Sequence, residues 1–153
     1  MTQTNKTVPE RLEGPGITLR RLQLTDRDAL AAAVAESADA LGAWMPWANG
    51  DYGPDEASTF LATAWLGWQA RTTFEFAVVD PEHGELLGLC GLNQRSGDSM
   101  NLGYWVRTPL AGRGITTLAA RRVAHFGFED VGLKRISLYH AVDNVASGRV
   151  AEK

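Results

Sequence analysis

The spacing of apolar residues changes period several times along the 153-residue chain. Alternation over Ile17–Leu22 predicts a first strand. The alanine-rich segment from Asp28 to Leu41 favours a helix. Apolar residues at helical spacing between Phe60 and Trp68 predict a second helix, which we expect to begin near Pro54. The chain therefore starts as strand, helix, helix.

The middle of the chain has the pattern of an antiparallel meander. Three β-rich segments follow one another at Thr73–Val79, Leu86–Leu92 and Met100–Arg107. Turn-forming residues separate them at 80–84 and 95–99. Short connections of this kind join neighbouring antiparallel strands.

The remainder predicts a helix from Ile115 to near Asp130, a strand over Leu133–Val142 and a last helix over Val145–Glu152. The element order β-α-α-β-β-β-α-β-α indicates an α/β fold of the α+β kind, with a mixed, mostly antiparallel sheet and flanking helices. We expect the strand–helix–strand crossover near the end to be right-handed.

Composition narrows the class of protein. The length predicts a single domain over residues 13–153, preceded by a flexible tail over residues 1–12. A net charge of −3 without a basic run argues against nucleic acid as a partner. The single cysteine, Cys90, fits a reducing cytoplasm, and no apolar run reaches the roughly 18 residues of a membrane span. No cluster of residues has the spacing of metal ligands.

The segment from Asn101 to Thr116 predicts an anion site. It has the pattern of a strand, a short loop and an arginine between Gly112 and Gly114 that opens a helix. Free N–H groups and the helix dipole favour a phosphate at such a helix start. Thr117 stands where a dinucleotide-binding motif would place its third glycine, and no Gly-Lys-Ser/Thr is present. A plain helix entry with two flexible glycines is the alternative.

An ordered set of motifs over residues 16–153 resembles the GNAT acyltransferase superfamily, and within it the RimJ/RimL type of N-acetyltransferase. The motifs are Trp44-Met45-Pro46-Trp47, Leu87-Gly88 with Cys90-Gly91-Leu92, Leu102-Gly103-Tyr104-Trp105-Val106, Gly112-Arg113-Gly114-Ile115-Thr116-Thr117, Phe126-Gly127-Phe128-Glu129, Leu133-Lys134-Arg135-Ile136 and Asp143-Asn144-Val145-Ala146-Ser147. Two departures stand out. Pro109 takes a place where the superfamily often has Gln or Arg, and the family normally continues past Lys153 with two further strands.

The resemblance implies an acetyl-CoA-dependent N-acetyltransferase in which a primary amine, either a protein N-terminus or a small amine, attacks the thioester directly. It assigns the pyrophosphate of coenzyme A to Ala111, Gly112, Arg113, Gly114, Ile115 and Thr116. It assigns the acetyl and pantetheine groups to Tyr104, Trp105, Val106 and Asn144, and proton donation to the departing thiolate to Ser147. The alternatives to cofactor binding are structural roles: packing in the sheet for Tyr104 and Trp105, and an ordinary helix N-cap for Asn144.

Two residues are candidates for the general base. An α-amine with a pKa near 7.8 leaves roughly a tenth of the molecules neutral at pH 7, so a weak base suffices. Glu75 and His140 both lie in predicted strands that border the expected cleft. Glu75 is preferred because a carboxylate also attracts a cationic amine. The alternative for each residue is a structural role, or simple exposure to solvent without a role in catalysis.

Trp44, Met45 and Trp47 are expected to line the acceptor side, since apolar residues around a proline in a loop are typical of a pocket or interface. Packing beneath the loop is the alternative.

The early end of the chain predicts a C-terminally truncated GNAT fold. Either the chain is a fragment or truncated form, or another segment or another chain, such as a second copy in a homodimer, completes the sheet. Two other functions stay open: an acyl-CoA-binding or assembly module with little turnover, and a transferase for longer acyl chains.

Overall fold

The computed structural model of the chain describes residues 8–36, 53–107 and 114–138. Within these residues a six-stranded sheet runs in the order β1-β2-β3-β4-β5-β6. The strands are β1 (Arg11–Gly14), β2 (Ile17–Arg21), β3 (Phe74–Val79), β4 (Leu86–Ser96), β5 (Ser99–Val106) and β6 (Arg135–Leu138). Neighbouring strands from β1 to β5 are antiparallel, and β5 and β6 are parallel. The predicted mixed, mostly antiparallel sheet is confirmed.

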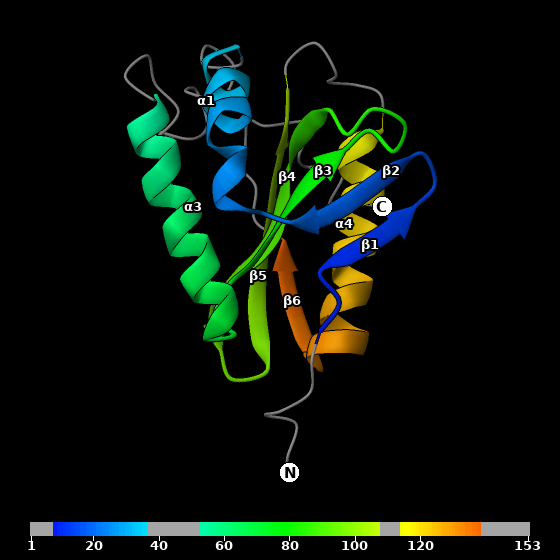
Figure 1. Cartoon of the computed structure of the whole chain (residues 1–153). Helices are drawn as coiled ribbons and strands as arrows, with labels where there is room; N and C mark the ends of the chain where they lie inside the picture. Colours follow the sequence, from blue (N-terminus) through cyan, green and yellow to red (C-terminus); the bar gives the residue numbers. More distant parts are fainter. Residues whose placement is uncertain (1–7, 37–52, 108–113, 139–153) are drawn as a thin grey trace, which may run out of the picture.

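Helices cover both faces of this sheet. A short 3₁₀ turn (Leu24–Asp26) leads into α1 (Arg27–Glu36), and α3 covers Pro54–Gln69. α4 (Ile115–Phe126) continues into one π-helical turn at Gly127–Val131. Figure 1 shows α1 and α3 on one side of the sheet and α4 on the other. No helix in the described ranges has the length and apolar character to cross a membrane.

The start of α3 follows from its sequence. Pro54 is the first helical residue, where its missing N–H costs nothing. The Glu56 carboxylate accepts a hydrogen bond of 2.8 Å from the Gly53 N–H, and Asp55 adds a second acidic group in the first turn. Negative charge at this end of a helix is stabilising.

The predicted elements are largely confirmed, with one correction at the N-terminus. The three-strand meander and the second helix lie where the pattern placed them, and β4 extends four residues beyond the prediction, to Ser96. The prediction of a flexible tail over residues 1–12 is wrong in part. Val8 is buried, and β1 begins at Arg11 and pairs with β2. The last predicted helix and the ends of the first helix and last strand lie outside the described residues.

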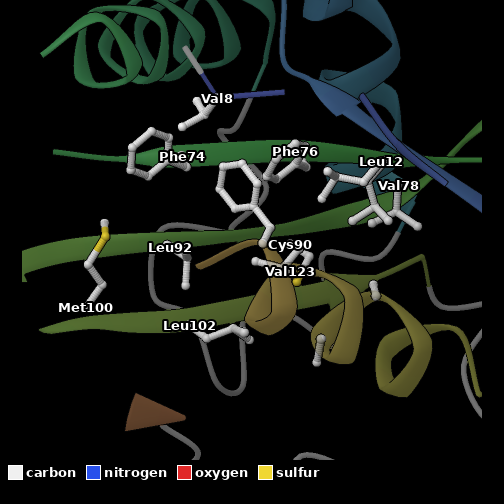
Figure 2. Packing of buried hydrophobic residues seen from close by; sticks show 14 of the residues in the cluster. Val8, Leu12, Phe74, Phe76, Val78, Cys90, Leu92, Met100, Leu102 and Val123 are labelled. Carbon is white, nitrogen blue, oxygen red and sulfur yellow. The ribbon is translucent and has the colours of Figure 1, made fainter. Parts of the chain in front are cut away.

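A large core fills the space between the sheet and α4. Figure 2 shows how side chains from successive strands converge on Val123 of α4. The ring of Phe126 lies 5.0 Å from Phe76 and 5.6 Å from Phe74, each in an edge-to-face arrangement, and 6.2 Å from Trp68 near the end of α3. Such pairs add stabilisation beyond the burial of apolar area. A second core packs α1 and α3 against Ala77, Leu89 and Trp105.

Arg21 ties β2 to α3. Its side chain is only 6% exposed, and its guanidinium lies 3.5 Å from the centre of the Trp65 ring. It donates hydrogen bonds to the Trp65 carbonyl and to the side chains of Gln69 and Glu10. A buried arginine is stable only where such partners replace water. The sequence pattern did not predict this contact.

Phe126→Ala tests the aromatic cluster. We expect it to lower the free energy of unfolding by about 3–5 kcal/mol, because it removes a fully buried ring and leaves a cavity. Phe128→Ala is the matched control, since Phe128 is 44% exposed; a change within about 0.5 kcal/mol is expected there. Denaturant unfolding of both variants measures the difference. Equal effects would contradict this description of the core.

Candidate functional site

A cleft of about 620 Å³ lies between the sheet and helices α1 and α3. Three strands form its floor, and the two helices form its walls. The lining residues are Leu30, Asp55, Glu56, Thr59, Phe60, Glu75, Leu89, Asn93, Gly103, Tyr104 and Trp105. Its size is in the range of a small-molecule site.

The register of the sheet creates this cleft. Glu75 of β3 pairs with Gly91 of β4, and Gly91 pairs with Gly103 of β5. A Cβ atom on Gly91 would lie 2.3 Å from Oε1 of Glu75 and 2.6 Å from the Phe74 carbonyl oxygen. Only glycine therefore fits beside the carboxylate. Glu75 is the one side chain in this row of three, and its neighbours in the row leave the space beside it open.

Burial perturbs the Glu75 carboxyl group. Loss of solvation raises its pKa to about 7, and a hydrogen bond from the Asn93 side chain partly opposes this rise. Burial, and to a smaller extent the Glu75 carboxylate, raises the pKa of the buried Cys90 thiol, so this thiol stays neutral. A carboxylate with a pKa near 7 can exchange a proton at physiological pH.

The charged groups along the described lining are all acidic: Asp55, Glu56 and Glu75. Leu30, Phe60, Leu89 and Trp105 supply apolar surface. Such a cleft favours a cationic ligand with an apolar part over an anionic one.

The start of α4 is the part of the predicted anion site that the structure describes. Gly114 caps the helix with φ of +77°, a left-handed conformation that suits glycine. The first helical bond runs from the Leu118 N–H to the Gly114 carbonyl, so the three preceding N–H groups have no partner within the helix. The first turn carries no acidic residue, and a Cβ on Gly114 would meet no atom within 4 Å. These features fit a pyrophosphate.

The end of β5 lies between the cleft and this helix start. β5 pairs with β6 only over Ser99–Leu102 in the described residues, whereas its pairing with β4 continues to Val106. Tyr104 and Trp105 line the cleft, and Trp105 is also buried against α1 and α3.

Residues 17–153 match the family model of the acetyltransferase (GNAT) domain. The chain belongs to the GNAT acetyltransferases. It is 30% identical over 145 residues to YdaF of Bacillus subtilis (strain 168), to which a ribosomal N-acetyltransferase activity has been ascribed; the match covers 90% of this chain and 75% of YdaF. The RimJ/RimL-type resemblance is confirmed.

Solved structures agree on the fold. RimL, a ribosomal L7/L12 alpha-N-protein acetyltransferase in complex with coenzyme A, superposes with a TM-score of 0.87 at 19% identity, covering 94% of this chain and 81% of RimL. A ribosomal-protein-S5-alanine acetyltransferase from Vibrio fischeri gives 0.82 at 18% identity, with 93% and 80% covered. Mycobacterium smegmatis RimJ in complex with a CoA-disulfide gives 0.80 at 21% identity, with 93% and 71% covered.

As a GNAT acetyltransferase, the protein uses acetyl-CoA as its acetyl donor. The structure describes part of the site predicted for this cofactor. Gly114, Ile115 and Thr116 lie at the start of α4, and Tyr104, Trp105 and Val106 end β5. Glu75, one of the two candidates for the general base, lines the cleft. The other predicted site residues lie outside the described residues: Ala111, Gly112, Arg113, Asn144, Ser147, His140, Trp44, Met45 and Trp47.

Sequence reasoning missed several features of this acetyltransferase. Asn93 and Gly91 matter through their position beside Glu75. Strand alternation along β4 predicts that the two share a face, but only the register of β3 and β4 places Glu75 beside them. Arg107, just after β5, forms a two-pronged ion pair with Glu36 at the end of α1, with N–O distances of 2.7 and 2.9 Å. The pair brings together residues 71 positions apart, and no local pattern predicts it.

A negative charge at Gly114 tests the cofactor site. Gly114→Asp places an anion beside the expected pyrophosphate, and we expect it to weaken coenzyme A binding about tenfold or more. Gly114→Asn is the matched control, because Asn has the same shape and adopts positive φ as readily. Calorimetric titration with coenzyme A compares the two. Equal affinity in both folded variants would refute the site.

Glu75→Gln tests the buried carboxyl group through stability. Because its pKa rises from 4.5 to about 7 on folding, the folded protein holds this proton more tightly, and stability falls as pH rises between those values. The variant should therefore be about 3 kcal/mol more stable than the parent at pH 8 and nearly equal at pH 4. Denaturant unfolding at both pH values measures this, with the exposed Glu129→Gln as control. A difference independent of pH would contradict the raised pKa.

Proposed function

We propose that this acetyltransferase moves the acetyl group of acetyl-CoA to a primary amine by direct attack, with Glu75 as the general base. The Glu75 carboxyl group in the glycine-floored cleft, with a pKa raised to about 7, carries this proposal. At pH 7 about half of such groups are ionised and can accept a proton.

Among the described residues, those of the acidic cleft act on the acceptor amine, and the end of β5 acts on the acetyl group. Asp55, Glu56 and Glu75 attract a cationic amine into the cleft, where the amine first loses one proton to solvent and becomes the neutral nucleophile. As its nitrogen bonds to the acetyl carbon and the carbon–sulfur bond to coenzyme A breaks, Glu75 accepts the second proton that the nitrogen loses. The backbone N–H near Val106 stabilises the developing negative charge on the acetyl oxygen; removing such a donor typically costs about 10²–10³ in rate. Bound acetyl-CoA supplies an activated thioester at this point.

Ser147 completes the proposal as the donor of a proton to the departing thiolate, and Asn144 as a ligand of the pantetheine arm. Trp44, Met45 and Trp47 are proposed to extend the apolar side of the acceptor site. These roles rest on the family resemblance. His140 is the competing base.

The proposed acceptor is the N-terminal α-amine of a ribosomal protein. YdaF and RimL carry ribosomal acetyltransferase names, and an α-amine needs only a weak base. A lysine side chain, with a pKa near 10.4, is almost wholly charged at pH 7 and demands more of the enzyme. A ribosomal acceptor would place the reaction in the cytoplasm.

Release of free thiol from acetyl-CoA tests the function directly. The assay compares peptides with free and blocked N-termini and a panel of small amines. Thiol release stimulated by free N-termini supports the proposal. Saturable coenzyme A binding without stimulation by any amine would favour a binding module and overturn it.

Glu75→Gln tests the base. We expect kcat/KM for the amine to fall by about 10²–10⁴ with coenzyme A affinity unchanged, because Gln cannot accept the proton. In the parent, kcat/KM should rise with pH through the Glu75 pKa of about 7 and level off once the α-amine, with a pKa near 7.8, is also neutral. Full activity in the variant, with the same rise near pH 7, would show that another group such as His140 is the base.

A further inference from the structure

Glu75 is held in place by two residues of the neighbouring strand. Gly91 leaves the space in which the carboxylate lies, since a Cβ there would come within 2.3 Å of its Oε1. Asn93, two residues further along β4, points from the same face and donates a hydrogen bond to the carboxylate. The cleft lining includes both Glu75 and Asn93.

We propose that Asn93 is a positioning residue of this acetyltransferase, whose side-chain amide holds the Glu75 carboxylate in the orientation that faces the acceptor amine. The inference rests on the proposed function, in which Glu75 is the base. It adds a residue that neither the sequence motifs nor the family resemblance assigned.

The Asn93 amide group lies on the face of β4 that carries Gly91, over which the Glu75 carboxylate lies. Its Nδ2 atom is 3.7 Å from the place that a Cβ on Gly103 would take, so it lies beside the row Glu75–Gly91–Gly103. A carboxylate can only accept hydrogen bonds, so the Nδ2 group must face it. A donor to the ionised form favours that form and opposes the effect of burial.

Other titratable groups around Glu75 do not replace this donor. Asp55 and Glu56 at the start of α3 line the same cleft and would raise the pKa of Glu75 if they acted on it. Glu56 is also engaged with the Gly53 N–H. Tyr104 of β5 lines the cleft, α1 contributes only the apolar Leu30, and the Cys90 thiol is kept neutral by burial. Asn93 is the neutral side chain that hydrogen-bonds Glu75 in the described site and lowers its pKa against the effect of burial.

β5 provides a matched control. Asn101 is the direct cross-strand partner of Asn93, but it does not line the cleft, and its side chain donates to Gln94. Asn101→Ala removes the same group from the same pair of strands without touching the base.

The experiment measures kcat/KM for the amine against pH in the parent, Asn93→Ala, Asn93→Asp and Asn101→Ala. We expect the acidic limb to move up by about one pH unit in Asn93→Ala, because the ionised carboxylate loses a donor. A larger upward shift is expected in Asn93→Asp, which keeps the shape and adds a like charge. At pH 7 a one-unit shift lowers the ionised fraction of Glu75 from about one half to about one tenth, so Asn93→Ala should lose about fivefold in kcat/KM and Asn93→Asp more. KM for acetyl-CoA should be unchanged in both, and Asn101→Ala should match the parent.

Carbon-13 NMR titration of the Glu75 carboxyl, assigned by its loss in Glu75→Gln, reports the same shift without reference to activity. An unmoved Glu75 titration in both Asn93 variants overturns the positioning role, even where Glu75→Gln is inactive. A moved titration with unchanged kinetics in Glu75→Gln shows instead that the proposed base is wrong, which also removes the catalytic role of Asn93.

Discussion

The fold depends on the burial of β4 on both of its faces. From Leu86 to Leu92 every residue of this strand is buried. Cys90 and Leu92 pack in the core beneath α4, whereas Leu89 packs beneath α1 and α3. A strand with two apolar faces is stable only between two covering layers, and this requirement explains why helices lie on both sides of the sheet in Figure 1.

The same strand sets the position of the site. Where Gly91 and Asn93 replace large apolar side chains on the α1–α3 face, the second core ends and the cleft begins. The opposite face continues without a gap through Leu92 into the core around Phe126. The cleft therefore forms where large side chains are missing from one face of the sheet, while the opposite face stays packed against α4. Such backing holds a carboxylate in a fixed position better than a loop would.

Local sequence patterns predicted most elements, because periodicity and turn residues act within a few positions. These patterns failed where burial or a contact depends on residues that are far apart in the sequence. Val8 and Leu12 lie in a polar stretch and are buried only because β1 pairs with β2, and Arg21 finds its tryptophan 44 positions away. Glu75 was recognisable as a lone charge in an apolar strand. Gly91 and Asn93 were not recognisable as its partners, because their role exists only once the strands are in register.

The Glu75 carboxyl group lowers the stability of the fold, but its raised pKa suits it to proton transfer. The next two residues on its face of β3, Ala77 and Val79, are apolar and fully packed against α1 and α3. An apolar residue at position 75 would extend that core, whereas the carboxyl group is partly desolvated and keeps a raised pKa. Groups held in an unfavourable environment are concentrated at functional sites. Asn93 recovers part of the lost solvation through one hydrogen bond but does not abolish the shift, and this balance leaves the carboxyl able both to release and to accept a proton near neutral pH.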